Sequence, residues 1–163
     1  MRVRKMRETD IGDITGIVLR IMGPRDARRV LADIKETLQK KETLGERQSA
    51  YKFDEFYVAE IDRRVVAAGG VWALRHDPYI GRLDWFMVHP EQQRKGLGSI
   101  LLKTIEKEMR KKKIRLILAE TSSEPAYKTA VKFWAKNGFK EILKIPGYWE
   151  DGSACLYFMK RLK

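Results

Sequence analysis

The chain has 163 residues, 44% of them hydrophobic, which predicts one domain over residues 1–163 and excludes a disordered polypeptide. Its 34 Lys and Arg outnumber its 22 Asp and Glu, and the net charge of +12 favours an anionic partner such as a polyphosphate cofactor or a nucleic acid. No apolar run approaches the ~20 residues of a membrane span, no signal-peptide region follows the basic N-terminus, and the single cysteine, Cys155, excludes an internal disulfide and a cysteine-rich metal site, so a cytoplasmic protein without a metal centre is expected.

The first part of the chain is predicted to form a strand and two helices. Residues 3–6 form the strand, and Asp10 is placed to cap a helix that runs to about Ile21. Gly23 and Pro24 end this helix, and a second helix is expected over residues 26–41. The inward-facing residues are predicted to be Ile11, Ile14, Ile17, Val18 and Ile21 in the first helix and Val30, Leu31, Ile34 and Leu38 in the second.

The middle of the chain is predicted to be a β-hairpin followed by a third strand. Residues 56–61 and 65–74 form the hairpin around a turn at residues 62–64. Gly69 and Gly70 inside its second strand indicate a bulge or the close approach of a ligand. After a loop over residues 76–81, the third strand covers residues 82–89 and ends at Pro90.

The last part of the chain alternates helices and strands. Helices are expected over residues 98–111 and 125–136, and strands over residues 114–120, 139–144 and 154–160. The resulting order, βααβββαβαββ, combines hairpins with strand–helix–strand units, and these units need right-handed crossovers. It predicts an α/β (α+β) fold with a mixed, mostly antiparallel, twisted central sheet flanked by helices on both faces.

The most informative segment joins the strand at residues 82–89 to the helix at residues 98–111. Gly96 and Gly98 stand where the helix begins, and the backbone N–H groups there have no partner inside the helix. Glycine lets a ligand approach these amides closely, and the helix dipole adds partial positive charge. Arg94 and Lys95 add two full charges beside them. The segment is therefore predicted to bind a phosphate group.

Residues 82–98 closely resemble motif A of the GNAT superfamily of acetyl-CoA-dependent N-acetyltransferases. Its signature, Gln/Arg-x-x-Gly-x-Gly/Ala, is matched by Gln93, Gly96 and Gly98. Residues 130–139 are similar to the superfamily's motif B, and residues 147–154 are similar to the loop before the last strand in the branch that acetylates alanine in ribosomal proteins. The resemblance spans nearly the whole chain. It implies a GNAT-like fold and direct transfer of an acetyl group from acetyl-CoA to a primary amine of a small molecule, peptide or protein.

The same resemblance places the contacts to acetyl-CoA on two stretches of chain. The backbone of Phe86, Met87 and Val88 pairs with the pantetheine arm, and the Val88 amide stabilises the thioester oxyanion. Tyr127, which stands where the family usually has an asparagine, is also assigned to the cofactor site. The pyrophosphate rests on Arg94, Lys95, Gly96, Leu97, Gly98 and Ser99.

Acetyl transfer also needs a base that deprotonates the acceptor ammonium. Glu120 is one candidate, because it ends the strand where the alanine acetyltransferase branch has its proposed base. Asp84 is a second, placed by strand alternation on the same face as Phe86, and Glu150 in the late loop is a third. Each of these carboxylates can instead cap a helix or pair with a lysine. His89 is interpreted as a turn residue.

The leaving thiolate needs a proton, and here motif B departs from the family pattern. The tyrosine that usually supplies this proton is replaced by Trp134, and an indole N–H is not a practical acid. Tyr127 and Tyr148 are the candidate substitutes, and solvent is another because the pKa of a thiol is already modest.

Three functions follow from the sequence. The first is an N-acetyltransferase. An alternative is a regulatory module that binds acetyl-CoA without efficient turnover, and the third is a nucleic-acid-binding protein, which the lack of a basic groove interleaved with aromatic residues disfavours. The acceptor site is expected from residues 21–51 and 146–152, with most of the tryptophans in the core. Similar proteins are commonly homodimers, and the Lys, Arg and Glu content resembles that of thermophile proteins.

Overall fold

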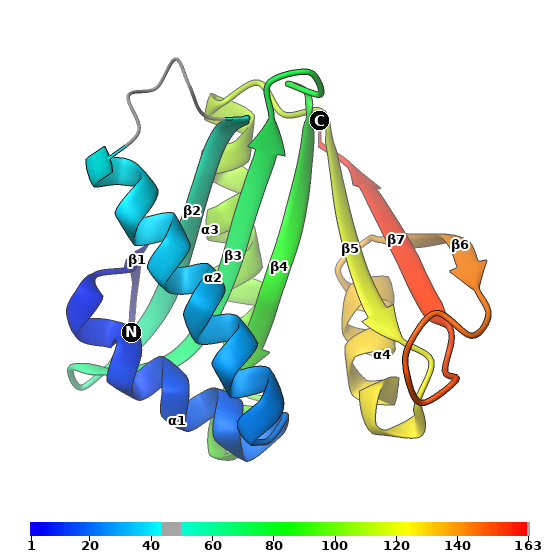
Figure 1. Cartoon of the computed structure of the whole chain (residues 1–163), viewed down its shortest axis with the longest axis horizontal. Coiled ribbons are helices and arrows are strands. Elements are labelled where there is room, and N and C mark those ends of the chain that lie inside the picture. Colours follow the sequence, from blue (N-terminus) through cyan, green and yellow to red (C-terminus); the bar gives the residue numbers. More distant parts are fainter. Residues whose placement is uncertain (44–49, 163) are drawn as a thin grey trace.

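A computed structural model describes residues 1–43 and 50–162, including the side chains except at positions 25, 26 and 39–43. Seven strands form one sheet in the order β1-β2-β3-β4-β5-β7-β6 (Figure 1). Every neighbouring pair is antiparallel except β4 and β5, which run parallel. The strands are β1 (Arg2–Lys5), β2 (Tyr51–Ile61), β3 (Arg64–Leu74), β4 (Ile80–Val88), β5 (Leu116–Ser122), β6 (Lys140–Ile145) and β7 (Cys155–Arg161).

Helices cover both faces of this sheet. On one face lie α1 (Ile11–Ile21) and α2 (Pro24–Thr43), and on the other lie α3 (Leu97–Lys111) and α4 (Lys128–Lys136) (Figure 1). Three short 3-10 helices, η1 (Glu8–Asp10), η2 (Pro90–Gln92) and η3 (Pro125–Tyr127), precede α1, α3 and α4. The fold class and the element order predicted from the sequence are confirmed. None of the described helices combines the length and the apolarity needed to cross a bilayer.

The hydrophobic core consists of two layers, one on each side of the sheet. Ile14, Ile17 and Val18 of α1 are fully buried in the layer beneath α1 and α2, as predicted. The inward placement of Ile21 is wrong, because α1 ends there and the side chain is 37% exposed. The second layer packs α3 and α4 on the opposite face and includes Leu101, Leu102 and Ile105.

Strand boundaries differ from the predicted ones mainly where charged residues interrupt the apolar pattern. Strand β2 begins at Tyr51 rather than at residue 56, because the charged residues Lys52, Asp54 and Glu55 hide its start. Strand β4 begins at Ile80, inside the predicted loop, and β5 runs on to Ser122.

The bulge predicted at Gly69 and Gly70 is confirmed by a register shift between β3 and β4 at this point. Aromatic rings fill the space that side chains at the two glycines would need. A Cβ at Gly69 would lie 2.8 Å from Cδ2 of Phe86, and a Cβ at Gly70 would lie 2.9 Å from Cζ of Phe56. The two glycines therefore let one ring approach the sheet from each face.

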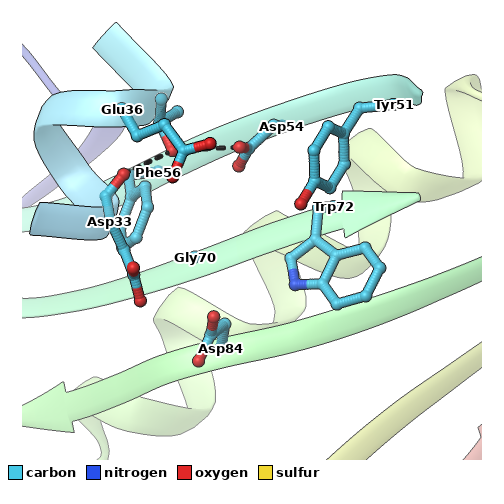
Figure 2. Close-up of a pocket in the computed structure, with 9 residues that line it drawn as sticks. Asp33, Glu36, Tyr51, Asp54, Phe56, Gly70, Trp72 and Asp84 are labelled. Atoms are coloured by element: carbon cyan, nitrogen blue, oxygen red, sulfur yellow. Dashed lines mark hydrogen bonds between the residues drawn. The ribbon is translucent and has the colours of Figure 1, made fainter. Parts of the chain in front are cut away.

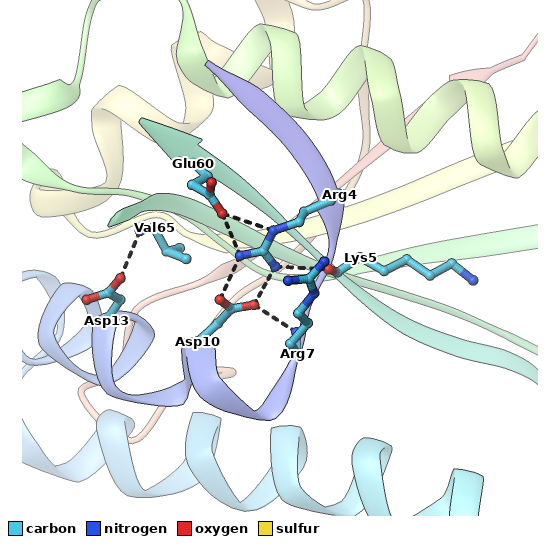
Figure 3. Close-up of polar contacts among 7 residues, drawn as sticks. All are labelled: Arg4, Lys5, Arg7, Asp10, Asp13, Glu60 and Val65. Atoms are coloured by element: carbon cyan, nitrogen blue, oxygen red, sulfur yellow. Dashed lines mark hydrogen bonds and ion pairs between the residues drawn. The ribbon is translucent and has the colours of Figure 1, made fainter. Parts of the chain in front are cut away.

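Asp10 is the N-cap residue of α1, as predicted, but its side chain makes no capping hydrogen bond to that helix and instead joins the helix to the first strand (Figure 3). Its carboxylate accepts hydrogen bonds from both terminal nitrogens of Arg4, at 2.7 and 2.8 Å, and from the Arg7 N–H at 2.7 Å. Arg4 also donates to Glu60 on β2. The buried Asp10 is therefore satisfied by the arginine, whose hydrogen bonds hold its pKa below the ordinary value.

Replacing Asp10 with asparagine is expected to lower the free energy of unfolding at pH 7 by about 1.5–3 kcal/mol, because the hydrogen bonds to a charged partner are weakened. The depressed carboxyl pKa contributes stability above the unfolded value of about 4, and this is lost as pH falls through the folded pKa. Urea denaturation at pH 7 and at pH 3 tests both points. The matched variant Glu60→Gln should cost less, since Glu60 is more exposed, and equal losses would contradict the assignment.

Candidate active site

Strands β4 and β5 form an opening in the middle of the sheet (Figure 1). They pair at Ile80–Leu116, Gly81–Ile117 and Arg82–Leu118, and no later residue of β4 pairs with β5. Beyond Arg82, β4 stays attached only to β3, with Val88 opposite Ala67. The second half of β4 therefore presents backbone N–H and C=O groups to the opening rather than to a neighbouring strand.

The N–H of Val88 points into this opening. The next N–H along the chain, that of His89, donates to the Val66 carbonyl on the β3 side at 2.8 Å. Successive N–H groups of a strand point to opposite edges, so the Val88 N–H points away from β3. An extended ligand with amide groups can pair with this free edge as an added strand would.

The first turn of α3 closes one end of the opening. Its N-cap, Gly96, has φ +80°, no side chain caps the turn, and no acidic residue lies in it. Gly98 is buried, and a Cβ there would lie 3.1 Å from the Phe133 ring and 3.4 Å from Cγ2 of Val88. The uncapped amides of α3 are therefore next to the free edge of β4, in the position that suits an anion.

Full positive charges lie on the loop that enters α3. Arg94 and Lys95 are both exposed, and Arg94 has φ +60°. The Lys95 ammonium donates to Oε1 of Gln92 at 3.0 Å. His89 acts as a turn residue as predicted, because its Nδ1 accepts the Glu91 N–H at 3.3 Å and caps η2.

A cavity of about 160 Å³ lies beneath α2, on the side of the sheet opposite α3 (Figure 2). Residues of β2, β3 and β4 line it, and Asp84 is the residue that β4 contributes. The lining residues are Asp33, Glu36, Thr37, Tyr51, Asp54, Phe56, Gly70, Trp72 and Asp84.

The prediction that Asp84 and Phe86 share a face of β4 is wrong. Trp85 between them has φ +45°, which breaks the strand alternation at the bulge. Asp84 lines the cavity beneath α2, and the Trp85 indole Nε1 donates to Oδ2 of Asp33 on the same side at 2.7 Å. Phe86 instead stacks on Phe133 of α4, with ring centroids 5.3 Å apart. The bulge therefore turns one carboxylate toward the cavity and one aromatic ring toward α4.

The environment of Asp84 favours its neutral form more than water does. Burial raises the pKa of its carboxyl to about 6, and the negative charge of Asp33 adds to the effect. Oδ1 accepts the Trp85 N–H at 2.8 Å. A carboxyl with a pKa close to neutral is a suitable proton acceptor for an amine.

Glu120 occupies the position on β5 that corresponds to Asp84 on β4. It lies two residues beyond the last β4–β5 pair, as Asp84 does on β4, and its charge also raises the pKa of Asp84. Glu120 is exposed and lies opposite Tyr157 in the β5–β7 register. Burial raises the pKa of Tyr157 well above its ordinary value, and the Glu120 carboxylate and Tyr148 add to the effect.

Tyr148 and Tyr127, the two proton donors predicted from the sequence, lie in different parts of the chain. Tyr148 is 47% exposed and packs edge-on against Trp149, at 4.8 Å between ring centroids. Tyr127 is half-buried and forms the N-cap of α4.

Cys155 is buried, as predicted, and burial raises its pKa to about 11, so the thiol stays protonated.

Trp134, at the motif B position, is only 5% exposed and packs among Phe86, Phe133 and Phe139. Its indole Nε1 has no hydrogen-bond partner within the described part of the chain. The position is therefore part of the aromatic core beneath α4 and offers no titratable group.

Comparison with known proteins decides the family. The family model described as the acetyltransferase (GNAT) domain matches residues 52–141, more than half of the 163 residues. The chain belongs to the GNAT acetyltransferase family. Comparison with curated protein sequences finds no match.

Solved structures of GNAT acetyltransferases share the fold over their whole length. A GNAT-family protein from Desulfovibrio desulfuricans is 20% identical, with a TM-score of 0.84 and 98% of each chain covered. The ribosomal-protein-S18-alanine N-acetyltransferase from Escherichia coli is 17% identical, with a TM-score of 0.74 and coverage of 99% of this chain and 94% of that one. An aminoglycoside 6'-N-acetyltransferase complexed with coenzyme A is 12% identical, with a TM-score of 0.74 and coverage of 99% and 97%.

Sequence reasoning missed several residues of this GNAT acetyltransferase that the fold brings to the site. Asp33 and Thr37 lie on α2, three residues after the buried Val30 and Ile34 and four residues from each other. Because residues 3 and 4 apart share a helix face, this spacing was a signal for their position in the sequence. Asp54 lay outside the predicted strand. Tyr157 lay inside one, but only the pairing of β7 with β5 places it opposite Glu120.

Proposed function

We propose that this GNAT acetyltransferase transfers the acetyl group of acetyl-CoA directly to a primary amine. The observation that carries the proposal is the junction of two features: the free edge of β4 in the β4–β5 opening, and the uncapped first turn of α3 beside it. The backbone of Phe86, Met87 and Val88 would hold the pantetheine arm. Residues 94–99 would hold the diphosphate, with charge from the loop and amides from the helix.

In this mechanism the amine enters from the cavity beneath α2. Asp84 accepts a proton from its ammonium form, and Glu120 is the alternative acceptor through a water molecule. The nitrogen lone pair then forms a bond to the thioester carbon, and the Val88 N–H stabilises the oxygen that becomes negative. The carbon–sulfur bond breaks, the nitrogen loses its second proton to solvent as the neutral amide forms, and coenzyme A leaves as a thiolate that takes up one proton.

The proton that the leaving sulfur needs has no source at Trp134, which is buried among phenylalanines. Tyr148 and Tyr157, the latter opposite Glu120 in the β5–β7 register, are candidate sources of this proton. Tyr127 at the start of α4 is the other phenol predicted for the role.

The lack of a phenol at position 134 favours one second candidate, a module that binds acetyl-CoA without efficient turnover. Calorimetric titration with acetyl-CoA and measurement of thiol release with a panel of primary amines separate the two. The proposed transferase predicts binding and amine-dependent thiol release. Binding with thiol release no faster than in the absence of amine would favour the second candidate, and no binding would contradict both.

A further inference from the structure

A surface pocket of about 470 Å³ lies at the end of the sheet where β4 and β5 begin. Three strands meet there, because Ile80 of β4 pairs with Leu116 of β5, and Leu116 also pairs with Arg161 of β7. Strand β4 has 9 residues, so Val88 at its other end lies about 26 Å from Ile80. Figure 1 accordingly shows the β3–β4 loop and the tip of β4 at opposite ends of the sheet. The surface pocket is therefore separate from the proposed acetyl-CoA site.

The charge around this surface pocket is positive. Arg115 and Arg161 line it and are exposed, and neither forms an ion pair with a carboxylate in the described part of the chain. The exposed Lys113, close to Arg115 in the chain, likewise has no ion pair among the described residues. The carboxylate of Asp77 also lines the pocket, but it is neutralised by Arg82, which donates to it at 2.7 Å. An anion that enters the pocket would therefore meet guanidinium groups that hold no described carboxylate.

An exposed tyrosine contributes an aromatic ring to the same surface pocket. Tyr79 is 46% exposed, and the guanidinium carbon of Arg115 lies 4.4 Å from its ring centroid. The backbone holds this pair in place, because the Arg115 N–H donates to the Tyr79 carbonyl at 2.8 Å and the Leu162 N–H donates to the Arg115 carbonyl at 2.8 Å. The Lys52 ammonium adds a positive charge 5.8 Å from the same ring centroid. A tyrosine ring beside a guanidinium group offers flat surfaces on which a nucleobase can stack.

The densest basic run of the chain leads into this surface pocket. Residues 110–115 read Arg-Lys-Lys-Lys-Ile-Arg. Arg110 and Lys111 suit the last turn of α3, where the helix dipole favours cations. That explanation does not extend to Arg115, which lies beyond the helix, or to Arg161, which comes from β7. The tyrosine and these two arginines lie in three separate segments of the sequence, so only the fold combines them.

We propose that this surface pocket binds a single-stranded nucleic acid. One base stacks on Tyr79 and Arg115, and the neighbouring phosphates contact Arg161 and Lys113. The pocket has room for about 15 groups of ~30 Å³ each, which suits the base and the phosphate of one nucleotide. An acidic peptide would use the positive charges but has no base to stack on the ring. A duplex keeps its bases paired, so the ring and the charges together favour a strand with accessible bases.

The test measures the fluorescence anisotropy of a labelled uridine octanucleotide as the protein is added, in the presence of excess coenzyme A. The coenzyme keeps the oligonucleotide from using the anion site proposed at the start of α3. Phosphate contacts to Lys113, Arg115 and Arg161 predict a slope of about 2 for log Kd against log salt, so Kd should rise about 20-fold between about 50 and 200 mM salt. Absence of binding at the lower salt concentration would overturn the inference.

Three variants separate stacking from charge. Tyr79→Leu removes the ring and should raise Kd about 5-fold to 100-fold at every salt concentration, with the salt slope unchanged. Arg161→Gln should raise Kd and also lower the slope by about 0.7. Arg2→Gln removes an equal charge from exposed β1, at the edge of the sheet, and should change neither quantity. An unchanged Kd in Tyr79→Leu, or equal effects of Arg2→Gln and Arg161→Gln, would contradict the proposed contacts. Thermal denaturation shows whether each variant is folded.

Competition experiments test the chemistry of the ligand. Unlabelled oligouridylate should displace the labelled strand at a lower concentration than polyglutamate of the same charge or uridine monophosphate does. Equal competition by polyglutamate would show that charge alone is recognised, and equal competition by the monophosphate would show a site for a free nucleotide. Either result would overturn the inference and leave the proposed acetyl transfer standing, because the surface pocket lies at the other end of β4 from Val88.

Discussion

Replacing Ser99 with aspartate is expected to stabilise the protein while weakening coenzyme A binding at least about 100-fold. Ser99 lies in the first turn of α3, which has neither a capping side chain nor an acidic residue. A carboxylate there interacts favourably with the helix dipole, by about 0.3–1 kcal/mol. The same carboxylate repels a bound diphosphate by about 4 kcal/mol at ~4 Å in a surface environment, and each 1.4 kcal/mol is a factor of ten in Kd.

The control for this variant is Gly12→Asp. Gly12 lies in the first turn of α1, a helix on the face of the sheet opposite α3 (Figure 1), and nothing lies within 4 Å of a Cβ built there. It makes the same change in net charge and should also raise the thermal midpoint, but it should leave the Kd for coenzyme A unchanged. Calorimetry and thermal denaturation in the same buffer measure both quantities. Coenzyme A binding that Ser99→Asp leaves intact would exclude the start of α3 as the diphosphate site.

The uncapped first turn of α3 at the end of β4 could be predicted because its parts are adjacent in sequence. The apolar strand, Gly96, Gly98 and the amphipathic helix follow one another, so local pattern alone places the free amides at the end of β4. The fold class was predictable for the same reason, since each strand and helix shows its own periodicity.

The face that Asp84 occupies could not be predicted from β4 alone. Nothing in residues 82–88 marks Trp85 for its positive φ. Its indole donates to Asp33 on α2, and the bulge partner on β3 is the Gly69 and Gly70 pair. The two glycines predicted that a bulge exists. They did not predict which residue of the facing strand β4 would change the face to which its side chain points.

The cavity and the contact between Glu120 and Tyr157 depend on strand order, which local patterns do not contain. The last strand, β7, inserts between β5 and β6 instead of pairing only with its sequence neighbour. That insertion places Tyr157 opposite Glu120. Likewise, Asp33 and Asp54 meet only because α2 crosses the sheet above β2 and β3 (Figure 2). Charged residues on separate elements give no hint in sequence that they share a wall.

Asp84→Asn is expected to lower kcat/KM by about 100-fold or more at pH 7.5, because a positioned base typically contributes 10²–10⁴ in rate. The same variant should be more stable than the parent by about 3 kcal/mol at this pH, since burial raises the carboxyl pKa from 3.8 to about 6 and ionisation in the folded state is costly. Asparagine keeps an oxygen that can accept the Trp85 N–H. Opposite signs for activity and stability are characteristic of a residue retained for catalysis.

The pH dependence makes this assignment specific. Between pH 4 and pH 6 the folded state binds more protons at Asp84 than the unfolded chain does, so the free energy of unfolding falls as pH rises through this window and stays lower above it. Asp84→Asn should remove that slope and also the fall in kcat/KM below about pH 6. Asp77→Asn is the control, because the Arg82 hydrogen bond lowers the pKa of Asp77 and its removal should not stabilise the protein. If Asp84→Asn keeps the parental pH–rate profile, Glu120 becomes the base, and Asp84 is a carboxylate that shapes the acceptor cavity only.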